Sequence, residues 1–463
     1  MNEELDIMNE ELTDTPRGSE SDATITPPAE EQTGRDISPA EPQPAKISEQ
    51  SIPQPQVAFK SPSAKAAPRR TTLRSLVRRL KGYAISIGFG IIIAAMMIAS
   101  IVIVPSLRVF FSERMTANGL GMFMVYWIAG MVILVAVMYA QIIIHEGGHL
   151  VCGLASGYRF VSFRVASLIL YRDGSRLRFG RFSIAGTAGQ CLLEPPTGRI
   201  EDADRMPLGA YIMGGAAANL TVAAVAAALL ATGIQNTAAA FTASMFLFTG
   251  IATAAMNGLP IRVGGMPNDG FNARIMRRDI EIRRMLWIQL TVNAQYSRGR
   301  LLRDMPDEWF AIPQGADLAN HMYTSVALFD VWRQIERRDF AAADDLLLRL
   351  HLREGRMIEL YRLETAVDRM FVAVMLQRPL QSIRNIFTDR VRAYVTADAR
   401  YNISHALELY AWERFVEGDA ERAADRAETI RRALPHHHAD GEAADCAELL
   451  AWMETLPDNY LCN

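Results

Sequence analysis

A long apolar segment that ends in two histidines constrains this chain more than any other feature. Residues 121–144 carry no formal charge, and the sequence HEGGH follows directly at residues 145–149. About 20 apolar residues in a row are enough for a helix to cross the hydrocarbon core of a bilayer. The chain is therefore expected to be a membrane protein with ionisable side chains at the end of a spanning helix.

The HEGGH pattern is typical of a metal site. His145 and His149 are four residues apart, so on a helix they lie on one face, about 6 Å apart along the axis, and can bind one ion. Glu146 would lie beside the metal as a general base. Chance matches to this pattern are common in soluble chains. However, ionisable groups at bilayer depth are costly and are retained mostly for function, which favours the metal site here.

The rest of the chain divides by composition. Residues 1–68 are rich in Pro, Glu, Ser and Thr, which predicts an acidic disordered tail because so little apolar surface is available for burial. The four cysteines show no CxxC pairing, so reduced thiols are expected. Cys152 follows His149 by about one helical turn, and a packing role is favoured over metal binding for it.

Four apolar segments are predicted to span the membrane, at about 83–105, 120–154, 208–233 and 238–259. Basic residues cluster before the first segment and between the second and third. These clusters are Arg69, Arg70, Arg74, Arg78, Arg79 and Lys81, then Arg159, Arg164, Arg172, Arg176, Arg178 and Arg181. The positive-inside rule then places both termini and the central loop in the cytoplasm. Arg108 and Arg114, which would lie outside, are minor exceptions to this rule. This pattern suits a bacterial plasma (inner) membrane.

Asp269 is the candidate third ligand. A hydrolytic zinc site uses three protein ligands and leaves one position open for water. Asp269 follows the last predicted span, and the topology places it at the same membrane level as the two histidines. The alternative is that the sequence Pro-Asn-Asp-Gly at 267–270 forms an ordinary turn.

Three sequence elements together resemble the site-2 protease family of intramembrane zinc metalloproteases. They are the HExxH helix, residues 213–220 (MGGAAANL), similar to the family's GGPxxNL pattern, and Asn257-Gly258-Leu259-Pro260 with Asp269-Gly270, similar to its NxxP...DG element. The resemblance covers about residues 120–275. It implies zinc bound by His145, His149 and Asp269, with Glu146 as the base. Two departures are Ala216 in place of the usual Pro and a longer spacing from Asn257 to Asp269.

Two further elements are predicted to handle the substrate. Asn219 would donate a hydrogen bond to the developing oxyanion or to the substrate backbone, or else act only as a hydrogen-bonding residue between helices. Residues 160–171 and 176–184 are predicted to form a β-hairpin around the turn signal Asp173-Gly174. Its edge would accept a substrate strand. Alternatively, the hairpin is structural, or its arginines contact anionic lipid.

The region after residue 275 is predicted to be helical and cytoplasmic. Similar segments at 338–343, 378–383 and 418–423 recur about every 40 residues, each starting the second helix of a pair. This period resembles tetratricopeptide-type arrays, which suggests a docking surface for a protein partner. A plain helical bundle is the alternative. The three histidines at 436–438 are left out of the metal site because adjacent residues cannot all face one ion from a regular helix.

The predicted fold is thus an α-helical polytopic membrane protein with about four transmembrane helices, a cytoplasmic β-hairpin insertion and a C-terminal tetratricopeptide-like domain. Its predicted parts are the tail (1–68), a basic segment with the first span and outer loop (69–119), the metalloprotease core (120–275) and the helical repeats (276–463). Expected partners are membrane-anchored substrates and lipid, with no nucleic acid. The alternative function is an inactive membrane scaffold or chaperone-like protein. A transporter would need more spans and an internal repeat.

Overall fold

The computed structural model describes residues 91–184, 186–263 and 265–461. The predicted disordered tail, the basic segment before the first span, the first eight residues of that span and Cys462 lie outside the described residues.

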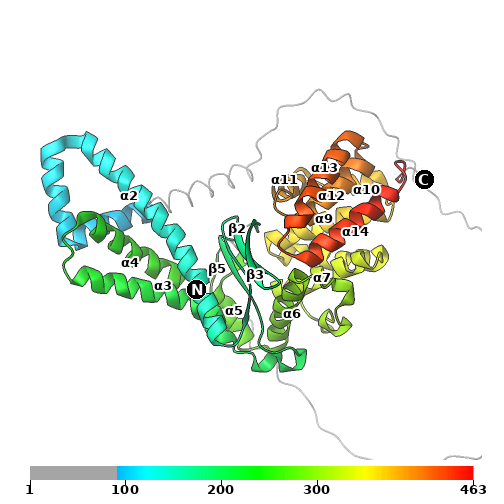
Figure 1. Ribbon diagram of the computed structural model, residues 1–463, viewed down its shortest axis with the longest axis horizontal. Helices are drawn as coiled ribbons and strands as arrows, with labels where there is room; N and C mark the ends of the chain where they lie inside the picture. Colours follow the sequence, from blue (N-terminus) through cyan, green and yellow to red (C-terminus); the bar gives the residue numbers. More distant parts are fainter. Residues whose placement is uncertain (1–90, 185, 264, 462–463) are drawn as a thin grey trace, which may run out of the picture. The chain divides into compact units, whose positions relative to one another are not determined.

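Three helical stretches are long and apolar enough to cross a membrane. They are Gly121–Ala155, which is the later part of α2 (Pro105–Ala155), together with α3 (Leu208–Ala231) and α4 (Thr237–Gly258). Helices α3 and α4 lie side by side, and α2 packs against both (Figure 1). Three of the four predicted spans correspond to these helices.

The first predicted span corresponds to a bent pair of helices. A helix at Ile91–Ile103 meets Pro105–Arg114 at an angle of 98°. Pro105 is the first residue of α2, where its missing N–H costs no helical hydrogen bond, and Val104 before it is extended. The described first helix rises about 20 Å, less than a bilayer core of about 30 Å. Within the described residues, a fourth span is present only if the bent pair counts as one.

A four-stranded antiparallel sheet follows α2, in the order β3-β2-β1-β4. Its strands are β1 (Arg159–Val165), β2 (Leu168–Asp173), β3 (Arg176–Arg181) and β4 (Gly189–Glu194). The predicted turn at Asp173-Gly174 is confirmed, since Asp173 pairs with Arg176 and Gly174 has a φ of 56°. The predicted extent of the hairpin strands was wrong. Ala166, with a φ of 51°, divides the first predicted strand in two, and β4 was not predicted.

Between α4 and the C-terminal region the chain forms a short ribbon and three helices. These elements are β5 (Arg262–Val263), β6 (Met266–Pro267), α5 (Asp269–Met276), α6 (Ile280–Ser297) and α7 (His321–Glu336). One apolar core joins the sheet, α3, α6 and α7, with Leu193, Trp287, Ile288 and Val326 fully buried in it. The first helices after residue 275 therefore pack directly against the elements beneath the candidate site.

The remaining helices share a second apolar core. They are α8 (Phe340–His351), α9 (Glu359–Met375), α10 (Leu380–Ile386), α11 (Asp389–Asp398), α12 (Ile403–Ala411), α13 (Ala420–Ala433) and α14 (Asp440–Thr455). Short helical turns lie at η1 (Ile200–Arg205), η2 (Leu302–Asp304), η3 (Asp307–Trp309), η4 (Glu354–Arg356), η5 (Trp412–Val416) and η6 (Leu434–His436).

The three similar segments in this region occupy equivalent local positions. Arg338, Gln377 and Gly418 have positive φ angles of 60°, 53° and 66°. Each residue ends one helix, and α8, α10 or α13 begins two or three residues later. The left-handed conformation at a helix end reverses the chain, so the recurring sequence marks a recurring turn between paired helices.

Candidate metal centre

The two histidines and Asp269 converge, although Asp269 is 120 residues away from His149 in the sequence. His145 and His149 lie on α2, and Asp269 is the first residue of α5. The Asp269 Oδ2 atom lies 3.0 Å from His145 Nε2 and 3.3 Å from His149 Nε2, and the two Nε2 atoms are 3.1 Å apart. Among the described residues these three form a group that could hold a metal ion.

Hydrogen bonds on the far side of each imidazole fix which nitrogen is free. His149 Nδ1 lies 2.7 Å from the carbonyl oxygen of Tyr211, which can only accept, so Nδ1 carries the proton. His145 Nδ1 lies 2.9 Å from Asn219 Oδ1 and donates in the same way. Both Nε2 atoms therefore turn their lone pairs toward Asp269, as in metal sites where a second bond orients the ligating histidine.

The donor set fits a cation on physical grounds. Two Nε2 lone pairs and a carboxylate oxygen within about 3 Å repel one another unless positive charge lies between them. Asp269 Oδ2 is buried and has no hydrogen-bond partner among the described residues. A bound cation would satisfy all three atoms.

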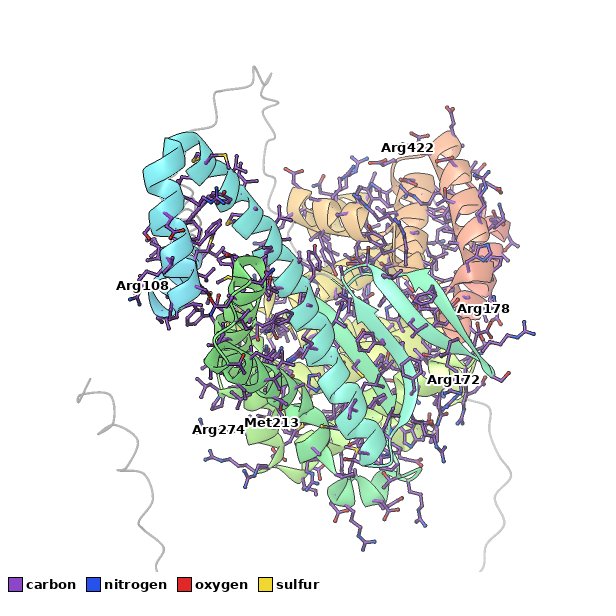
Figure 2. The ribbon with its side chains drawn as sticks, turned by 60° about the vertical axis from the view of Figure 1, so that its left-hand side comes forward. Arg108, Arg172, Arg178, Met213, Arg274 and Arg422 are labelled. Atoms are coloured by element: carbon purple, nitrogen blue, oxygen red, sulfur yellow. The ribbon has the colours of Figure 1, made fainter. Side chains whose placement is uncertain are left out.

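Glycines let α2 and α3 come close enough to build the site. A Cβ added at Gly215 would lie 2.5 Å from His145 Cε1 and 2.6 Å from His149 Nε2. A Cβ added at Gly148 would overlap the carbonyl oxygen of Gly214. Gly148 therefore admits the backbone of α3, whereas a Cβ added at Gly147 would meet no heavy atom within 4 Å beyond its chain neighbours and its own helix backbone. Met213, which precedes Gly214 and Gly215 on α3, is labelled in Figure 2.

Helix α5 is held against the end of α4 by contacts that sequence reasoning missed. The Asn268 side chain caps α5 by accepting from Phe271 N, 2.8 Å away. Its amide donates to the carbonyl oxygens of Met256 and Leu259 at the end of α4. A Cβ added at Gly270 would overlap Gly258 O. The extra residues between Asn257 and Asp269 form the β5–β6 ribbon, so the longer spacing still brings Asp269 to the histidines.

A cavity of about 480 Å³ opens in front of the three ligands. Glu146 lines it and is 8% exposed. Residues 186–191, which include the start of the edge strand β4, form one wall, and a Cβ added at Gly189 would overlap Glu146 Oε1. The rest of the lining is partly polar, with Gln141, Thr253, Asn257, Asn268 and Asn272, and partly apolar, with Ile142, Ile212, Met256, Met266, Met276 and Met322 among others.

Asn219 lies behind His145 and not in this cavity. Its side chain is fully buried, and its amide nitrogen donates to Gln141 O at 3.0 Å and to Gln141 Oε1 at 2.6 Å. Both amide hydrogens are therefore used, and none is left for a substrate oxygen. Gln141 in turn donates to Thr249 Oγ1 on α4, which ties three helices together behind the ligand.

The remaining candidates lie apart from the ligands. Cys152 packs against Gly214, where an added Cβ would be 2.9 Å from the Cys152 Cβ. His438 stacks on Phe182, with ring centroids 4.2 Å apart. No family model, curated protein or solved structure matches this chain.

Proposed function

We propose that this protein is an intramembrane zinc metalloprotease that hydrolyses peptide bonds of membrane-anchored proteins near the cytoplasmic face. One observation carries the proposal. Two histidines with fixed tautomers and a carboxylate whose Oδ2 atom is buried converge beside a cavity that Glu146 lines, at the end of a helix able to span a membrane. A purely structural site would have no need of an open cavity or of an acid within it.

The donor set fits zinc and disfavours Ca²⁺ and Mg²⁺. Two imidazole nitrogens and one carboxylate oxygen are the ligand types of catalytic zinc sites, which keep a further position open. Ca²⁺ and Mg²⁺ prefer oxygen ligands. When bound, zinc would lower the pKa of a water molecule and polarise the scissile carbonyl.

Within this chemistry the chain's own groups have separate tasks. Glu146 takes the proton from the attacking water and later passes it to the leaving amine. Asn219 and the Tyr211 carbonyl oxygen hold the imidazoles in the required orientation. We therefore assign Asn219 a positioning task in place of the donor task predicted from the sequence.

The position of the site relative to α3 supports cleavage near one membrane face. Gly215, against which both imidazoles pack, is seven residues after the start of α3 at Leu208. At about 1.5 Å per residue, the ligands lie roughly 10 Å from that end of the helix. The basic loop before α3 makes this the cytoplasmic end by the positive-inside rule, so the C-terminus is cytoplasmic in a plasma membrane. The N-terminus is cytoplasmic as well when the bent pair before α2 forms one span.

A substrate helix must unwind before a protease can reach its carbonyl groups, and β4 offers a partner for the unwound segment. Strand β4 is an edge of the sheet, and its first residues line the cavity beside Glu146. We propose that substrate adds to this edge as a strand. The proposed docking edge is therefore β4, whereas the sequence had suggested an edge of the hairpin. The C-terminal helices, with their recurring turns, would present a tetratricopeptide-like surface to a cytoplasmic partner.

A comparison of protein N-termini tests the proposal. Membranes from cells that express the wild type or Glu146→Gln would be analysed for new N-termini that lie near the cytoplasmic ends of membrane spans. The proposal expects such termini with the wild type only, while both proteins retain about one zinc. Identical sets of N-termini would contradict protease activity and would favour the scaffold function.

A further inference from the structure

A buried arginine in the sheet has no acidic partner. Arg164 lies on β1 with an exposed fraction of 0%. Within the described part of the chain, no carboxylate lies within ion-pair distance of its guanidinium, and its Nε is buried without a hydrogen-bond partner. From the sequence, Arg164 belongs to the basic residues of the central cytoplasmic loop, within the predicted strand 160–171. A buried, unpaired cation is costly compared with an apolar side chain of similar size, so its presence calls for an explanation.

The guanidinium bonds both to the β1–β2 turn and to the end of the loop that leads into β4. Arg164 Nη1 donates to Ala166 O at 2.7 Å. Nη2 donates to Gly189 O at 3.2 Å and to the hydroxyl of Thr187. The Ala166 N–H also donates to Ala188 O at 2.8 Å. Four bonds, three of them from one planar group, therefore fix residues 187–189 to the β1–β2 turn.

The fixed segment is the cavity wall nearest to Glu146. Thr187, Ala188 and Gly189 line the cavity, and Gly189 packs so closely on Glu146 that an added Cβ would overlap its carboxylate. A small displacement of this segment would therefore move the Glu146 side chain or open space for it to turn. Arg164 touches neither the metal ligands nor the cavity, so its contact with Glu146 runs through this wall, while its charge also attracts the Glu146 carboxylate.

We propose that Arg164 is a positioning residue that clamps residues 187–189 against Glu146. This inference rests on the proposed function only for its catalytic consequence, since the clamp itself is a property of the fold. The fork of the guanidinium is the essential feature. A lysine ammonium keeps the charge but cannot reach both backbone carbonyl oxygens and the hydroxyl in one plane.

The test compares three variants of the full-length protein in detergent micelles. Arg164→Met removes the charge and the bonds, Arg164→Lys keeps the charge, and Arg172→Met is the matched control. Arg172 is an exposed arginine of the same sheet, on the neighbouring strand β2 (Figure 2). Zinc content, hydrogen exchange of peptides covering residues 186–191 and turnover of fluorescein-labelled casein would be measured for each.

The clamp predicts that Arg164→Met keeps its zinc but that the backbone amide hydrogens of residues 186–191 exchange about tenfold faster. Losing even one of the three charge-assisted bonds shifts the local opening equilibrium by roughly that factor or more. The kcat for casein should fall about tenfold or more with little change in KM, and Arg164→Lys should restore it only in part. Wild-type exchange in Arg164→Met would overturn the inference whether or not casein is cleaved. Faster exchange with an unchanged kcat would overturn the positioning role. Casein left intact by the wild type, together with no new N-termini in membranes, would instead count against the proposed function, while the exchange measurement still decides the clamp.

Discussion

The substitution Gly215→Ala probes the centre most sharply, because a single methyl group meets both imidazoles. The added Cβ would lie 2.5 Å from His145 Cε1 and 2.6 Å from His149 Nε2, whereas ordinary contacts begin at 3.4 Å. The imidazoles or α3 must therefore move by about 0.9 Å. Metal–ligand distances tolerate only about 0.2 Å, so zinc affinity is expected to fall by a factor of about 100 or more.

Zinc affinity would be measured by competition with a chelator, with thermal unfolding of the zinc-free protein as the check on folding. Gly147→Ala is the matched control, because it adds the same methyl group to α2 next to Glu146, where no heavy atom lies within 4 Å. It should leave zinc affinity unchanged and stabilise the helix by about 0.5–1 kcal/mol. Wild-type zinc affinity in Gly215→Ala would refute the close packing on which the site depends.

Two further substitutions test separate parts of the structure. Asn219→Ala removes the acceptor of the His145 Nδ1–H, so zinc affinity should fall about 10- to 100-fold in the same competition assay, and no loss would contradict the orienting role. Burial raises the pKa of Glu336 from 4.5 to about 7, so the folded state binds more protons and loses stability as the pH rises from about 4.5 to 7. Glu336→Gln, which mimics the protonated acid, should therefore stabilise the protein by up to about 3 kcal/mol at pH 8 and very little at pH 4. Melting temperatures at the two pH values would show this, and an equal effect at both would contradict it.

The convergence of the three candidate metal ligands could be predicted from the sequence because its signals are local or topological. The spacing of His145 and His149 fixes their common helix face, and the alternation of spans brings the residues after α4 to the same membrane side. The position of Asp269 follows from these two facts. The packing of Gly215 on the imidazoles could not be predicted, because it depends on how closely α2 and α3 approach.

The tasks of the polar side chains were harder to predict, because each depends on a partner distant in the sequence. Asn219 has its amide hydrogens taken by Gln141, 78 residues away. Arg164 was counted among the basic residues of a loop, yet its side chain is fully buried in the sheet. The division of the first predicted strand at Ala166 had no signal, because neither glycine nor proline marks that turn.

X-ray absorption at the zinc edge tests the central claim most directly, because it identifies the atoms bound to the metal in the purified protein. A centre built from His145, His149 and Asp269 predicts nitrogen and oxygen neighbours at about 2.0–2.1 Å, with the outer-shell pattern of two imidazoles. The Asp269→Ala variant should lose an oxygen neighbour from its protein ligands or fail to retain zinc. A sulfur neighbour near 2.3 Å, or zinc without imidazole, would contradict the proposed centre.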